Sequence, residues 1–194
     1  MKYASLFLAV AGVAVAGCQA SDASQAGTQT KRYRSIGRDA SYAEVRAWDI
    51  DANPDGAGLP TGRGTYAKGA DVYAKQCAVC HGAKGEGIPP TYPKLIGAEP
   101  KNFPFGDDPK AAKTVGNYWP YATTLYDYIN RAMPFPASST LKPDEVYSVV
   151  AFLLAENGVI ARDAIMNARM LPAVKMPGRA HFVLDDRKGG PGFR

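Results

Sequence analysis

The chain has 194 residues, 46% of them apolar and 21% charged, which suits one compact domain with extensions and excludes two full-sized domains. Its 23 basic and 18 acidic residues are scattered and give a formal net charge of +5, without the basic stripe and interleaved aromatic residues of a nucleic-acid-binding protein. The 3 cysteines are too few for a disulfide-framed fold. The 20 glycines and 15 prolines predict long irregular segments.

Residues 1–17 have the pattern of a secretory signal peptide: Lys2 precedes an apolar run of about 14 residues, which is too short to cross a membrane as a helix. The run ends in small residues before Cys18. This junction resembles a bacterial lipobox, which implies acylation of Cys18, a lipid anchor and a periplasmic location. The alternative is ordinary cleavage that leaves Cys18 as a free thiol. Residues 18–31 lack apolar periodicity and are expected to form a flexible tether.

Helical periodicity and helix-ending residues mark the elements that follow. Residues 32–64 are expected to be an irregular extension holding one short helix, capped by Asp39 or Ser41. Pro134 and Gly158 each follow the end of a later helix. No segment alternates apolar and polar residues regularly enough to predict a strand. The predicted helices cover 41–47, 66–76, 123–132, 143–157 and, within a wrapping tail at 159–194, 163–168.

A C-x-x-C-H motif, formed by Cys77, Cys80 and His81, lies at the end of the helix predicted over 66–76. Two thiols three positions apart can each add to a vinyl group of one haem, and the adjacent histidine then becomes an axial ligand of the iron. The spacing therefore predicts one covalent haem c. The Pro- and Gly-rich segment 82–119 agrees, because so long a loop in a compact domain needs a large non-peptide core to wrap.

Three other interpretations of the motif remain as alternatives. A zinc site needs four nitrogen or sulfur ligands, and only His181 is left to join the motif. A thioredoxin-like redox pair needs a βαβ context, which the pattern does not provide. A disulfide between Cys77 and Cys80 leaves His81 without a role.

Met133 is the predicted sixth ligand of the iron. It directly follows a helix end and precedes a proline that fixes the backbone, so its thioether can be held rigidly. A core-filling role is the alternative. Met176, which also precedes a proline, is the second choice as ligand. The other candidates, expected to pack in the interior or lie at the surface, are Met166, Met170 and His181.

The order of helix, C-x-x-C-H, long loop, helix, Met-Pro and helix resembles a class I cytochrome c over residues 66–157. The resemblance implies an all-α fold with three main helices around one haem, in a domain at 65–158. It also implies that Gly69 and Tyr73 contact an aromatic residue of the last helix, either Tyr147 or Phe152. Lys142 departs from the family pattern, since a capping Ser or Thr is commoner there.

The same resemblance extends to Pro93-Lys94-Leu95. It implies that the Pro93 carbonyl accepts a hydrogen bond from His81, which fixes the ring and raises its basicity. It also places Leu95 among the cofactor-binding residues. Other prolines that compete for this role are Pro89, Pro90 and Pro100.

The flanks, around Trp48, Asn117 and Met176, resemble the monohaem subunit of bacterial sulfite dehydrogenases and a haem domain of the sulfane dehydrogenase of thiosulfate-oxidising systems. This implies a one-electron carrier without enzyme activity of its own. A molybdenum-containing dehydrogenase subunit would be the donor, and a downstream cytochrome or oxidase the acceptor. Two alternatives remain: a haem enzyme or gas-binding cytochrome with a displaceable sixth ligand, and a lipoprotein whose haem serves only folding.

Overall fold

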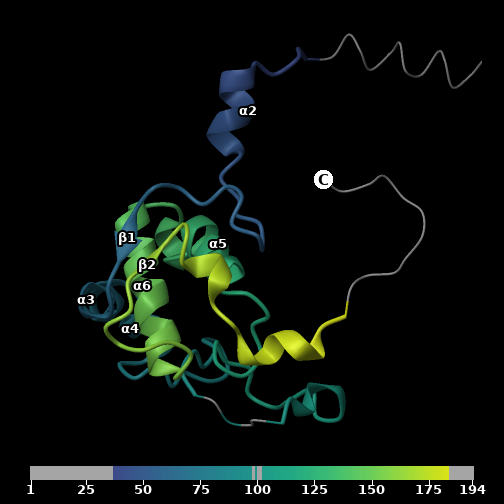
Figure 1. The fold of residues 1–194 in the computed structure, drawn as a ribbon, viewed down its shortest axis with the longest axis vertical. Coiled ribbons are helices and arrows are strands. Elements are labelled where there is room, and N and C mark those ends of the chain that lie inside the picture. Colours follow the sequence, from purple (N-terminus) through teal and green to yellow (C-terminus); the bar gives the residue numbers. More distant parts are fainter. Residues whose placement is uncertain (1–36, 98, 100–101, 184–194) are drawn as a thin grey trace, which may run out of the picture. The chain divides into compact units, whose positions relative to one another are not determined.

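The computed structural model describes residues 37–97, 99 and 102–183, and its contacts divide the chain into two units, residues 1–45 and 46–194. The predicted all-α architecture is confirmed, and among the described residues no helix combines the length and apolar character needed to cross a membrane. In chain order the elements are α2 (Tyr42–Trp48), β1 (Arg63–Gly64), α3 (Tyr66–Gln76), α4 (Ala78–His81), the 3₁₀ turn η1 (Pro104–Gly106), α5 (Ala122–Ala132), η2 (Phe135–Ala137), α6 (Pro143–Glu156), β2 (Met166–Asn167), η3 (Leu171–Ala173) and η4 (Pro177–His181) (Figure 1).

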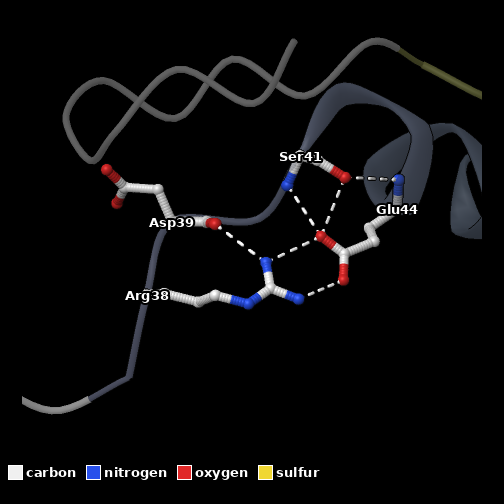
Figure 2. A network of polar contacts seen from close by, with 4 residues as sticks. All are labelled: Arg38, Asp39, Ser41 and Glu44. Carbon is white, nitrogen blue, oxygen red and sulfur yellow. Dashed lines mark hydrogen bonds and ion pairs between the residues drawn. The ribbon is translucent and has the colours of Figure 1, made fainter.

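The start of α2 is held by a reciprocal cap between Ser41 and Glu44 (Figure 2). The Ser41 N–H donates to Glu44 Oε2 at 2.8 Å, and the Glu44 N–H donates to Ser41 Oγ at 3.3 Å. Arg38 also pairs with Glu44, and this hydrogen bond, with those from Ser41, lowers the pKa of Glu44 to about 2. The short helix predicted over 41–47 is therefore present one residue later, and Ser41 is its cap.

The centre of the second unit is α6, in which every residue from Val146 to Leu154 is buried. A helix buried on all sides must be crossed closely by its neighbours. At the crossing with α3, a side chain at Gly69 would collide with the Ser148 carbonyl, so glycine is required there. The Tyr73 ring lies 5.0 Å from that of Phe152, which makes Phe152 the aromatic partner of α3.

Tyr147 instead faces α5, where its ring centroid lies 4.5 Å from that of Tyr126. Its hydroxyl donates to the Pro60 carbonyl at 2.8 Å and ties the segment before β1 to α6. At the helix start, Glu145 Oε2 accepts from the Lys142 N–H at 2.9 Å, so Glu145 supplies the cap that the Lys142 side chain cannot.

The prediction that the chain has no strands is wrong, because β1 and β2 form an antiparallel pair in which Gly64 faces Met166. A side chain at Gly64 would collide with the backbone at Ser148, so only glycine lets this pair approach α6. The helix predicted over 163–168 is also wrong. The Asn167 side chain accepts from the N–H groups of Arg169 and Met170, at 2.9 Å each, and this turn replaces helical hydrogen bonds.

The extension before β1 is anchored to α5 through Asp127, which is buried. Its Oδ1 accepts from the Ala52 N–H at 2.9 Å, and its carboxylate also pairs with Arg131. Burial raises the pKa of Asp127, but the bonds from Arg131 and Ala52 lower it more, so the net pKa lies below its usual value. The extension is thus held on the domain by a charged group that stays ionised.

Candidate functional site

The C-x-x-C-H motif is wound into a short turn of helix directly after α3. The Cys77 N–H donates to the Tyr73 carbonyl at 2.9 Å, and the Cys77 carbonyl accepts from Cys80 and His81 at 3.1 and 2.9 Å. Gly82 then ends α4 with a φ of 79°, a left-handed value that favours glycine. The Tyr73 hydroxyl donates to the Gly82 carbonyl at 2.9 Å, so α3 fixes both ends of the motif.

The His81 ring is oriented by the loop that follows. Its Nδ1 lies 3.0 Å from the Pro93 carbonyl oxygen, the contact that the family resemblance implies. A carbonyl oxygen can only accept, so Nδ1 carries the proton. The other nitrogen, Nε2, therefore presents a lone pair, which is the state that a metal-binding histidine needs.

Backbone hydrogen bonds give this loop a defined shape. The Gly85 carbonyl accepts from Leu95 and Ile96 at 2.8 and 3.1 Å, and the Gly87 N–H donates to the His81 carbonyl at 2.8 Å. Gly87 has a φ of 77°, and a side chain there would press on the Pro93 backbone. The first part of the predicted long loop, from Gly82 to Ile96, therefore has a defined backbone conformation that holds the His81 ring in place. Leu95, in the same segment, is partly buried against the core.

Asn157, just beyond the end of α6, ties the loop that follows His81 to the rest of the domain. Its side-chain oxygen accepts from Gly97 and Gly116, each at 3.0 Å. Its side-chain nitrogen donates to the carbonyls of Leu95 at 3.2 Å and Leu153 at 2.7 Å. The sequence indicates Asn157 only as the last residue of a helix, because three of its four partners, Leu95, Gly97 and Gly116, lie far away along the chain.

Replacing Asn157 by alanine is expected to lower the free energy of unfolding by about 3 to 4 kcal/mol, since it removes four hydrogen bonds of about 1 kcal/mol each at a buried position. Denaturant unfolding of the haem-loaded protein measures the loss. Asn130→Ala is the matched control, because Asn130 makes one long bond of 3.5 Å to the Ile50 carbonyl. Equal losses in the two variants would contradict the clamping role of Asn157.

The two thiols of the motif are not joined in a disulfide, and both are partly buried. Burial raises the pKa of Cys77 to about 11, with a smaller contribution from Cys80. The Tyr92 ring meets the His81 ring edge-on, with ring centroids 6.3 Å apart. In the part of the chain that the structure describes, no three His, Cys, Asp or Glu residues are grouped to hold a metal ion.

Met133 directly follows α5 in extended conformation, and its N–H donates to the Ile129 carbonyl at 3.1 Å. Its side chain is partly buried against the core. Met166 and Met176 are buried, Met170 is 46% exposed, and His181 is exposed with its ring stacked on Phe103. A methionine enclosed by protein on all sides has no room for another ligand. The partial exposure of Met133 therefore favours it over Met176 as the partner of a bound group.

The structure brings four of the sequence-predicted residues together in one place, namely Cys77, Cys80, His81 and Pro93, with Leu95 in the same loop. Met133 lies at the end of α5, and Pro93 is the proline that contacts His81. Cys18 and Pro100 lie outside the described residues. Asn157 and Tyr92 are additions that sequence reasoning missed.

The cytochrome c family profile matches residues 66–156, from α3 to the end of α6. The chain is also similar to a solved chain of the sulfane dehydrogenase SoxCD from Paracoccus pantotrophus, with a TM-score of 0.68 and 40% identity. That match covers 78% of this chain and 72% of the other.

A thiosulfate dehydrogenase of Thiomonas intermedia (strain K12) is 30% identical over 125 residues, or 60% of this chain. The chain spans only 36% of the length of that relative.

Proposed function

The chain belongs to the cytochrome c family, and we propose that it is a monohaem electron-transfer subunit that accepts single electrons from a dehydrogenase of sulfur compounds. Its cofactor is covalent haem c, and its haem domain is related to subunits of sulfur-oxidising dehydrogenases. The similarity to the sulfane dehydrogenase chain carries the proposal, since at 40% identity it extends beyond the family core into the flanks.

The residues of the site suit this cofactor. Two unjoined thiols stand three positions apart, and the adjacent histidine has its Nδ1 proton held by Pro93. We propose that Cys77 and Cys80 form the thioether links: each S–H adds across a vinyl group, so that a C–S bond forms, the double bond becomes single and the thiol proton goes to the neighbouring carbon. His81 Nε2 and the Met133 sulfur would hold the iron.

This ligand set supports one-electron transfer. With both residues bound, the iron would offer no position to a substrate, and a thioether ligand would favour Fe(II) and raise the reduction potential. The haem supplies the change between Fe(III) and Fe(II). The protein holds the His81 ring through Pro93, and Leu95 and Met133, which are partly buried against the core, would contact the haem.

The proposed donor is a molybdenum-containing dehydrogenase subunit, and the proposed acceptor is a downstream cytochrome or oxidase. The periplasm is the proposed location, with the chain attached to a membrane by lipid on Cys18. The signal-like residues 1–17 and the small residues before Cys18 support this part of the proposal. The mass of the mature N-terminal peptide tests it, and an unacylated Cys18 would contradict the anchor.

Purifying the tagged protein from its native host tests the partner. We expect a second subunit and molybdenum to copurify, and addition of a sulfur compound such as sulfite or thiosulfate to reduce the haem within the complex. A tagged Cys77→Ser/Cys80→Ser variant is the control for reduction that does not pass through this haem. A protein isolated without molybdenum, whose haem no sulfur compound reduces, would contradict the proposed donor.

The similarity to a thiosulfate dehydrogenase supports a second candidate, a haem enzyme that itself oxidises thiosulfate. Such an enzyme needs a displaceable ligand on the iron, whereas the carrier needs both ligands to stay bound. Carbon monoxide distinguishes the two. Rapid binding to the reduced native protein would favour the enzyme, and little or no binding would favour the carrier.

A further inference from the structure

Residues 50–54, in the extension before β1, run along one face of α5 in the direction opposite to the helix. Every second residue of this segment is hydrogen-bonded to a side chain of α5: Pro54 to Thr123, Ala52 to Asp127 and Ile50 to Asn130, at 3.3, 2.9 and 3.5 Å. The three side chains are four and three positions apart, so they share one face of the helix. Segment 50–54 is therefore fastened along almost the whole length of α5.

Asp127 makes the strongest of these three contacts. It is buried, and its Oδ1 accepts from both the Ala52 N–H and Arg131 Nε, each at 2.9 Å. Its second oxygen is paired with the Arg131 guanidinium. Hydrogen bonds to an ionised group are about twice as strong as those between neutral groups, and burial shields them from water. Asp127 is thus the main link between the segment and α5.

The segment continues into a turn of defined shape. The Asn53 N–H donates to the Ala57 carbonyl at 2.8 Å, and the Gly56 N–H donates to the Asn53 carbonyl at 2.9 Å. A side chain at Gly56 would collide with the Pro172 ring in η3, so the turn packs closely against the tail. Because the turn is itself held in place, the bond to Ala52 restrains the movement of α5.

α5 carries Met133 at its end. Arg131, the partner of Asp127, lies in the last turn of the helix, two residues before Met133. The Met133 N–H donates to the Ile129 carbonyl at 3.1 Å, so its backbone is joined to the helix and moves with it. A neutral thioether is a weak metal ligand, and its retention depends on how accurately the surrounding protein holds it.

We propose that Asp127 is a positioning residue that keeps the Met133 sulfur on the iron by tying α5 to segment 50–54. This inference rests on the proposed role of Met133 as a ligand. Without the tie, α5 moves more freely, and an external ligand displaces the thioether more easily. That exchange breaks one bond from sulfur to iron, forms one bond from the incoming ligand and leaves the oxidation state unchanged.

The test is Asp127→Asn, titrated with imidazole as the ferric holoprotein. Asparagine has nearly the size of aspartate, but it lacks the charge that pairs with Arg131. We expect imidazole to bind about tenfold more tightly than to the unaltered protein, the factor that corresponds to the loss of a hydrogen bond to a charged group. The visible absorption spectrum measures the binding. An unchanged imidazole affinity would overturn the proposal.

Asp144→Asn is the matched control, because it alters a carboxylate that holds the same extension to α6 instead of α5. Asp144 Oδ1 accepts from the Arg63 N–H at 2.8 Å. We expect this variant to bind imidazole as the unaltered protein does. Equally tight binding in both variants would show that any loosening of the extension weakens the hold on Met133, and the specific role of Asp127 would be wrong.

A second measurement uses the unaltered protein, because coupling between two sites acts in both directions. Saturating imidazole, which displaces Met133, should speed deuterium exchange in a peptide that contains Ala52. A peptide that contains Arg63 should not change, since Arg63 is bonded to α6. Unchanged exchange at Ala52 would contradict the coupling, even if Asp127→Asn does not fold.

Failure of the proposed ligand gives a different result. If Met133→Ala keeps the spectrum and the imidazole affinity of the unaltered protein, then Met133 does not bind the iron, whatever Asp127→Asn does. If Met133→Ala opens the iron but Asp127→Asn leaves the imidazole affinity unchanged, only the positioning role of Asp127 is wrong.

Discussion

Replacing both Cys77 and Cys80 by serine is expected to yield a mature protein with no covalently bound haem. Serine has nearly the size of cysteine, so the turn of helix around the motif can still form, but its hydroxyl does not add to a vinyl group. Partly buried apolar side chains such as Leu95 and Met133 would then lose the haem that we propose they contact. We therefore expect loss of colour together with a large loss of stability.

Acid-acetone extraction followed by a haem stain of the denatured protein measures this prediction. The single variants Cys77→Ser and Cys80→Ser each keep one thiol and should retain haem in reduced yield. Cys18→Ser is the control for removal of a cysteine outside the motif, and it should keep its covalent haem although the proposed lipid anchor is lost. Full covalent haem in the double variant would contradict the attachment sites and the further proposals built on them.

Replacing Met133 by alanine is expected to lower the reduction potential by more than about 100 mV, within the span of about 0.8 V that axial ligands cover. A thioether ligand stabilises Fe(II), and alanine would offer no ligand in place of the proposed one. The open position should then bind carbon monoxide rapidly in the reduced protein. Spectroelectrochemistry and a carbon monoxide titration measure the two effects.

Two further variants separate ligation from packing. Met133→His keeps a ligand at the same position, so it should have a lowered potential but bind little carbon monoxide. Met170→Ala removes an exposed methionine and should change neither quantity. If Met133→Ala keeps the native spectrum, Met133 is a packing residue. The same losses in Met176→Ala would then identify Met176 as the ligand.

The three main helices could be predicted to within a residue or two because their signals are local. Val146, Val149 and Val150 recur with helical spacing, and Pro143 and Gly158 bound the segment. The pair β1–β2 could not be predicted, because a strand of two residues shows no alternation. Its position depends on the close approach of Gly64 to α6, which no local pattern records.

The residues of the candidate site also fall into two groups: those that a local sequence pattern reveals and those that only the fold reveals. The C-x-x-C-H spacing is local and specific, so Cys77, Cys80 and His81 are recognisable from the sequence. The choice of Pro93 among several prolines came from the family resemblance, and the structure shows its contact with His81. Asn157 and Tyr92 carry no such signal. Their roles arise from partners that only the fold brings near, as the bonds of Asn157 to Gly97 and Gly116 illustrate.

The pairing of Gly64 with Met166 bears on how the chain reaches its native state. The two strands lie on either side of the family core at 66–156, so their pairing closes a loop of about 100 residues, a slow and entropically costly step. Because the chain is synthesised from its N-terminus, β2 becomes available only after all the proposed haem residues. The buried side chains of Met166, Leu171 and Met176 are therefore added to the core last, and we expect full resistance to proteolysis only once this segment has packed.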